Sequence, residues 1–231
     1  MNASIDRALG RRAFLAGASV GTLALTLPGC ASSPRYSLTE AIRRMLLLAS
    51  ERAFARLVEP GGFWDAQVAR VGLGNLLGTR GDVLSRILTS ALFKDRLEEA
   101  FADIAIEGSE RAAPLVADAV RVIGFENALD LVRGGPRAAT AFLQGEMGGR
   151  LIEEMVPELG RAIELASDPL VGQLVDAITG ANVNGVAARL AGKVNEAIWA
   201  EIGNEEAAIR ADPRATRDPL LIGVFGLGAR Y

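Results

Sequence analysis

The chain contains no histidine among its 231 residues and has a single cysteine. Histidine is the commonest general base, metal ligand and pH-sensitive switch. Its absence therefore removes the usual side chain for base catalysis, metal binding and pH sensing. A single cysteine leaves no second thiol for a disulfide within the chain. Aromatic residues are also scarce, at 5% of the sequence. We therefore expect no catalytic residue of the common types, no metal site and no cofactor.

An excess of positive charge is lacking as well. The 25 Lys and Arg stand against 28 Asp and Glu, which gives a formal net charge of −3. Residues 1–29 hold three of the arginines and one aspartate, so the remainder carries a net charge of −5. Binding to nucleic acid needs clustered Lys and Arg side chains, and the sequence has no basic stripe. We expect no nucleic-acid partner.

Residues 1–29 have the composition of a cleaved signal peptide. Arg7, Arg11 and Arg12 precede an apolar stretch at residues 13–27, which is the order of a charged n-region and an apolar h-region. Glycine, serine and threonine interrupt the stretch, and it falls short of the roughly 20 strongly apolar residues that span a bilayer. The sequence therefore predicts a removed signal and not a permanent membrane helix.

Cys30 lies at the end of this stretch, in Leu27-Pro28-Gly29-Cys30. A small residue before a cysteine at this place is typical of a bacterial lipobox, in which the thiol receives a diacylglycerol before cleavage. We expect Cys30 to be the lipidated first residue of the mature chain, with residues 30–36 as a tether. The alternative is a buried core cysteine, but its neighbours have no periodic apolar pattern that would bury it.

Arg11, Arg12, Phe14 and Leu15 resemble the twin-arginine export signal, which carries folded proteins across the membrane. Paired arginines also occur in ordinary n-regions, and this is the alternative. Both routes lead out of the cytoplasm. The residue after the cysteine is Ala31 and not aspartate, which favours the outer membrane over the inner one. We expect the protein at the periplasmic face of the outer membrane, held by its lipid.

Residues 37–231 are predicted to form one all-α domain, an irregular helical bundle. Alanine is abundant and β-branched residues are few, which favours helices, and the length suits a single core. Ser37-Leu38-Thr39-Glu40 is a capping box that should begin the first helix, and Pro60-Gly61-Gly62 should end it. Apolar residues recur at helical spacing between these signals. They are Leu38, Ile42, Met45, Ala49, Ala53 and Leu57.

Helical periodicity continues through the middle of the chain. Residues 92–123 are predicted to be helical, with Pro114 in the first turn of a new helix. A short helix at residues 125–131 should close at Gly134-Gly135. The helix after it should bend at Gly148-Gly149 and at Pro157.

The last long helix is predicted to follow a loop at residues 180–185 and to end at Asp212-Pro213. Apolar residues recur along it at strict four-residue intervals, and Trp199 beside them is assigned to the core. Residues 220–225 should dock as a final short helix, which is too short to span a membrane. The apolar residues of the long helix are Val186, Leu190, Val194, Ile198 and Ile202.

Two groups of side chains are candidate site residues. Phe63 and Trp64 are surface candidates that would wall a ligand cleft or touch lipid, whereas an aromatic pair after a helix-ending turn is more often packed on the core. Glu146, Glu153 and Glu154 are the carboxylates near apolar positions. They would support acid and base catalysis if two of them were buried in one cleft.

Six segments follow one another in a recognisable order along the predicted domain. They are Ser37-Leu38-Thr39-Glu40, Pro60-Gly61-Gly62-Phe63, residues 125–131, Gly134-Gly135-Pro136-Arg137-Ala138-Ala139-Thr140, Asp212-Pro213-Arg214-Ala215-Thr216-Arg217-Asp218 and Val224-Phe225-Gly226. Their order and spacing resemble the bacterial domain-of-unknown-function 4197 family. The resemblance implies an all-helical exported domain with no assigned activity, and it supplies no catalytic residues.

These observations favour a lipid-anchored binding or scaffolding domain of the cell envelope, which holds a partner protein or an apolar ligand near the membrane. One alternative is an enzyme of the acid/base hydrolase type that uses carboxylates alone, and another is a purely structural envelope protein. A solvent-open apolar cavity would favour ligand binding, and a flat apolar patch would favour a protein partner. Converging carboxylates would favour chemistry.

Overall fold

The computed structural model describes residues 34–77, 91–122, 124, 126–164 and 183–226. Residues 34–231 cluster as one compact unit. No strand occurs in the described ranges, and the all-α prediction is confirmed. The helices are α1 (Pro34–Leu57), α2 (Phe63–Val71), α3 (Leu73–Leu77), α5 (Ala91–Val122), α6 (Ala128–Arg133), α7 (Ala138–Met147), α8 (Arg150–Glu164), α10 (Val183–Ala211), the 3-10 helix η1 (Pro213–Thr216) and α11 (Pro219–Phe225).

The residues of the predicted signal and anchor lie outside the described ranges. They are Arg11, Arg12, Phe14, Leu15 and Cys30. Cleavage, lipidation and the export route therefore stay predictions.

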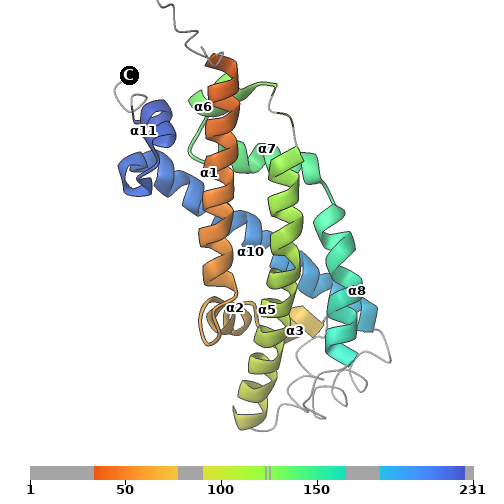
Figure 1. The fold of residues 1–231 in the computed structure, drawn as a ribbon. Helices are drawn as coiled ribbons and strands as arrows, with labels where there is room; N and C mark the ends of the chain where they lie inside the picture. Colours follow the sequence, from red (N-terminus) through yellow and green to blue (C-terminus); the bar gives the residue numbers. More distant parts are fainter. Residues whose placement is uncertain (1–33, 78–90, 123, 125, 165–182, 227–231) are drawn as a thin grey trace, which may run out of the picture. The chain divides into compact units, whose positions relative to one another are not determined.

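Helix α10 is the centre of the unit. It packs against α1, α8, α7, α5 and α3, and α1 and α5 pack against each other beside it (Figure 1). The apolar stripe predicted for this helix is buried along its length because it faces several neighbours at once. Its buried residues include Val186, Leu190, Val194, Ile198, Trp199 and Ile202. The helix begins at Val183, so the predicted loop at residues 180–185 is wrong in its last three residues.

The face predicted for α1 is confirmed, but its first residue is not. Ile42, Met45 and Ala49 are buried, and the helix ends before Pro60-Gly61-Gly62 as expected. It begins at Pro34, one turn before the capping box, so residues 34–36 of the predicted tether are helical. Proline suits a first helical turn because its φ is preset and it has no N–H to satisfy. The box therefore lies inside the helix.

Helix α5 runs without interruption through Pro114, so the predicted new helix at that residue is wrong. A proline inside a helix removes the hydrogen bond to the carbonyl four residues earlier, here that of Glu110. Both Pro114 and Glu110 are exposed, so water can satisfy this carbonyl. Ala112 and Val116 on the opposite face are buried, and their packing keeps the helix in one piece.

The chain breaks between α7 and α8, where the sequence predicts only a bend. Gly148 has φ +53°, a left-handed conformation that suits glycine and ends the helix. Pro157 lies on the exposed side of α8 and remains inside that helix. The short helix before Gly134 begins at Ala128, later than predicted, and the final helix α11 forms as expected.

Candidate functional site

Phe63 and Trp64 begin α2 and belong to the core. The Trp64 side chain is 1% exposed, and its Nε1 donates to Ser109 Oγ at 3.1 Å. Ser109 Oγ in turn donates to the carbonyl of Ala105 at 2.8 Å. Phe63 is half-buried and meets the indole edge to face, with ring centroids 5.1 Å apart. A surface role for Trp64 is therefore wrong, because a buried hydroxyl satisfies its one polar group.

Glu146, Glu153 and Glu154 do not form a catalytic pair. All three side chains are exposed, the first on α7 and the others on α8. Acid and base catalysis by this group required two of them to be buried in one cleft, and none of the three is buried. In the part of the chain that the structure describes, no three acidic or cysteine side chains converge as a metal site.

The buried carboxylate of the described residues is Glu206, which the sequence reasoning missed. It lies on α10 and is 0% exposed. Its Oε1 accepts from Ala139 N at 3.0 Å, and its Oε2 accepts from Thr140 N at 2.7 Å and Thr140 Oγ1 at 2.6 Å. Arg210 Nε donates to Oε1 at 2.8 Å. Both oxygens are thus occupied, which suits a structural carboxylate.

Arg210 lies one turn further along α10 and binds the end of another helix. Its Nη1 donates to Val132 O at 3.0 Å, and its Nη2 donates to Leu131 O at 2.8 Å. Only 10% of its side chain is exposed. Its guanidinium carbon lies 4.9 Å from the centroid of the Phe225 ring, which brings α11 against it.

Glu206 and Arg210 together hold the corner between α6 and α7. The carboxylate binds the first N–H groups of α7, where the helix dipole is positive, and the guanidinium binds the last carbonyls of α6, where it is negative. Arg137 at the N-cap position of α7 supplies no side-chain cap, so Glu206 from a distant helix takes that role. The i, i+4 pair on α10 therefore sets the positions of two short helices.

Gly134 makes this corner tight. A Cβ atom at this residue would lie 2.6 Å from the Cβ of Ala138 and 3.0 Å from the carbonyl oxygen of Asp130. Both neighbours belong to helices, so neither can move away freely. Only glycine fits at residue 134, which gives a physical reason for the Gly134-Gly135 pair that was predicted to close the short helix.

Helix α11 is tied to the unit through its N-cap. Asp218 Oδ1 accepts from Leu220 N at 2.8 Å and Leu221 N at 3.3 Å, and Arg44 of α1 donates to its Oδ2 at 3.3 Å. Burial raises the pKa of Asp218, but these hydrogen bonds outweigh it and hold that pKa below its usual value. A hydrogen bond from Arg44 likewise lowers the pKa of Glu40.

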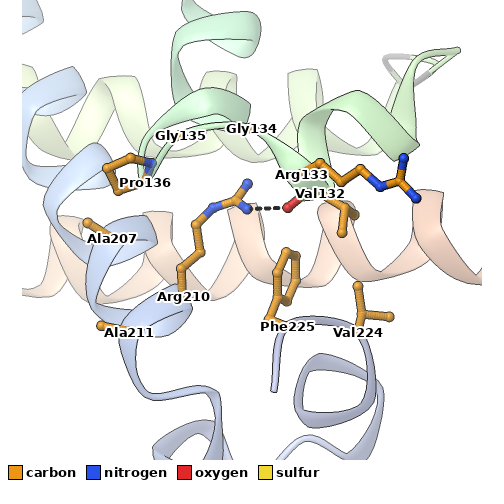
Figure 2. A pocket seen from close by; sticks show the side chains of 10 residues that line it. All are labelled: Val132, Arg133, Gly134, Gly135, Pro136, Ala207, Arg210, Ala211, Val224 and Phe225. Carbon is orange, nitrogen blue, oxygen red and sulfur yellow. Dashed lines mark hydrogen bonds between the residues drawn. The ribbon is translucent and has the colours of Figure 1, made fainter. Parts of the chain in front are cut away.

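A pocket of about 740 Å³ lies between the α6–α7 corner, the end of α10 and α11. Figure 2 shows the Arg210 side chain reaching toward Val132 in the middle of the pocket, with Phe225 beside it. Arg133 is an exposed cation at its edge. Most of the other lining residues are apolar or glycine. The lining consists of Val132, Arg133, Gly134, Gly135, Pro136, Ala207, Arg210, Ala211, Val224 and Phe225.

A signal for this site was present in the sequence. Glu206 occupies the next position of the four-residue series that runs through Ile198 and Ile202. A charged residue in an apolar series indicates either the end of the buried face or a buried and paired charge. Only the structure distinguishes these two, because the backbone N–H groups that bind Glu206 belong to residues 66 and 67 positions away.

No curated protein and no solved structure matches the chain. None of the described helices combines the length and apolar character needed to cross a bilayer. The model of the family described as "Protein of unknown function (DUF4197)" matches residues 33–226, and the chain therefore belongs to this family.

Proposed function

We propose that the protein is a lipid-anchored binding domain of the bacterial cell envelope, and that its ligand is an apolar molecule held in the pocket at the α6–α7 corner. The observation that carries this proposal is the pocket itself, which combines apolar walls with a fixed guanidinium. Its volume of about 740 Å³ falls within the range of about 300–1,000 Å³ that is usual for small-molecule sites. The anchor rests on the sequence pattern around Cys30 and on the export signal before it.

The pocket favours a ligand with an apolar body and one acidic group. Val224, Phe225 and Pro136 provide the apolar contact. Arg210 has one acceptor on Nη1, Val132 O, which leaves the second hydrogen of this nitrogen for a ligand oxygen. Glu206 neutralises Arg210, so the positive charge that attracts an acidic group comes from Arg133 at the edge. A fatty acid or another amphiphile with a carboxylate or phosphate group has this chemistry.

The distribution of exposed apolar groups favours a small ligand over a protein partner. Among the described residues, the large apolar side chains that are exposed are Val122 and Leu129. A protein-binding surface of this kind normally needs a contiguous apolar patch of several hundred Å². A concave pocket is therefore the better candidate for binding.

Pocket binding can be tested with a dansyl-labelled fatty acid as the probe. The helix α10 offers a matched pair of exposed alanines, Ala211 in the pocket lining and Ala200 outside it. We expect the Ala211→Trp variant to fill the pocket and to weaken probe binding about tenfold, which corresponds to about 1.4 kcal/mol. The Ala200→Trp variant should bind like the unchanged protein. Absence of saturable binding, or equal binding by both variants, would contradict the proposal.

The anchor needs a separate test. Mass spectrometry of the mature N-terminal peptide should find Cys30 as the first residue with its acyl chains attached. The Cys30→Ala variant should move from the membrane fraction to the soluble fraction. A native protein that keeps residues 1–29 and an unmodified thiol would show that the anchor is wrong, whatever the result for the pocket.

A further inference from the structure

The distance between the proposed lipid and the first helix is limited by the chain. Helix α1 begins at Pro34, four residues after Cys30. A fully extended chain advances at most about 3.3–3.6 Å per residue, so four residues reach about 14 Å. The beginning of α1 must therefore lie close to the bilayer surface whenever Cys30 is acylated.

The pocket lies at this same end of the unit. Helices α6 and α11, which form two of its walls, both pack against α1. Figure 1 shows α6 beside the first turns of α1. Arg44, in the third turn of α1, holds Asp218 at the start of α11. Helix α2 follows the opposite end of α1, which is about 36 Å away for 24 helical residues at about 1.5 Å each.

Exposed apolar side chains occur at the α6 end too. Leu129 on α6 is 45% exposed, and Val122 at the last turn of α5 is 81% exposed. They flank the connection between these two helices. Apolar side chains are unfavourable when they are exposed to water, and their transfer to a membrane interface is favourable. The position of Leu129 and Val122 therefore agrees with the short tether, which places the α6 end close to the bilayer surface.

We infer that the end of the unit formed by the first turns of α1, α6 and α11 faces the bilayer, so that the ligand pocket lies beside the membrane surface and the α2 end points away from it. The partner of this surface is the lipid bilayer, which Leu129 touches. This inference rests on the proposed acylation of Cys30. It gives the proposed ligand a source, because an amphiphile could pass between the bilayer and the pocket over a short distance.

The orientation can be measured on the full lipidated chain in vesicles of phosphatidylethanolamine and phosphatidylglycerol. Since Cys30 is the chain's one native cysteine and carries the lipid, a single introduced cysteine can be labelled with bimane. The Leu129→Cys variant places the label on α6, and the Ala69→Cys variant places it at an exposed position on α2. With nitroxide-labelled lipids as the quencher, we expect a loss of fluorescence at 129 and none at 69.

A longer tether supplies the control. Ten Gly and Ser residues inserted between Ser33 and Pro34 add a reach of about 16–19 Å, and quenching at 129 should then fall. Co-sedimentation with the vesicles distinguishes a failure of the proposed anchor from a failure of the proposed orientation. A protein that fails to sediment contradicts the anchor and the orientation together. A protein that sediments with equal quenching at 129 and 69, or with quenching that the longer tether leaves unchanged, contradicts the orientation alone.

Discussion

Arg189 and Arg210 stand near the two ends of α10 and bind short helices in the same way. Arg189 donates to the carbonyls of Leu76 and Leu77 at 2.9 and 2.8 Å, as Arg210 does to those at the end of α6. Helices as short as α3 and α6 are not stable alone. A guanidinium that binds their last carbonyls supplies hydrogen-bond donors that the helix itself cannot provide.

The two arginines differ in what compensates their charge. Arg189 forms no ion pair with any described side chain and lies beside Lys193 in a pocket of about 520 Å³. The Arg210 side chain is 10% exposed, and Glu206 neutralises it. Removing two charges from water costs several kcal/mol per ion, which only good geometry offsets. The α6 end therefore depends on a pair whose members cannot be changed singly, whereas the α3 end tolerates the loss of its cation more easily.

The largest effect is expected for Glu206→Ala. This change leaves Arg210 buried without its carboxylate and removes the acceptor of Thr140 N and Oγ1. We expect the free energy of unfolding to fall by about 3–5 kcal/mol, which is usual when one member of a buried ion pair is removed. Urea denaturation followed by circular dichroism measures it.

The neighbouring residue provides the control for this prediction. Glu205 lies next to Glu206 on α10 and is itself 14% exposed, but its partners Arg52 and Arg56 reach the surface, with side chains 36% and 48% exposed. Surface pairs contribute about 0.2–1 kcal/mol, so Glu205→Ala should cost no more than about 1 kcal/mol. Equal losses for the two alanine variants would mean that burial of Glu206 has no energetic role.

A comparison of Arg210→Lys with Arg189→Lys tests the difference between the two ends directly. Lysine keeps the charge but cannot hold two carbonyls with a planar fork. We expect a loss of about 2–3 kcal/mol for Arg210→Lys, where a charged hydrogen-bond network is disrupted, and about 1 kcal/mol for Arg189→Lys. Thermal unfolding of both variants gives the ranking, and the reverse order would contradict the comparison.

The smallest effect is expected for Asp218→Ala, which removes the N-cap of α11. Loss of such a cap typically costs about 1 kcal/mol. The pKa of Asp218 is lowered in the folded state from its ordinary value of 3.8. The folded protein therefore binds fewer protons here than the unfolded chain, and the carboxylate stabilises the fold above that value.

The contribution of the Asp218 carboxylate to the free energy of unfolding should disappear as the pH falls through its lowered pKa in the folded state. Glu40, whose pKa is lowered from 4.5, behaves in the same direction. We expect the difference in unfolding free energy between the unchanged protein and Asp218→Ala to be constant at neutral pH and to shrink below pH 3.8. A difference that grew in acid would mean that the Arg44 contact does not stabilise the ionised form.

Much of the fold could be predicted because its signals are local. The spacing of Ile42, Met45 and Ala49 identifies the buried face of α1 before any partner is known. The predicted helix start at the capping box was wrong because Pro34 suits the first turn of a helix and begins α1 earlier. The predicted break at Pro114 was wrong because the affected carbonyl, that of Glu110, faces water, which spacing does not reveal. The place of Trp64 was ambiguous in the sequence because its hydrogen-bond partner, Ser109, lies 45 residues away.

The sequence by itself determined that this chain is helical, which faces its long helices bury, and that the first of them ends before Pro60-Gly61-Gly62, because each of these follows from residues within a few turns of one another. Only the tertiary structure decided that Glu206 is buried and that a pocket lies beside it. Apart from each other, Glu206 and Arg210 bind partners that lie 66 to 79 residues away. A Glu-Arg pair at four-residue spacing has the same sequence whether it lies in water or in the core, and only packing against α6 and α7 distinguishes the two.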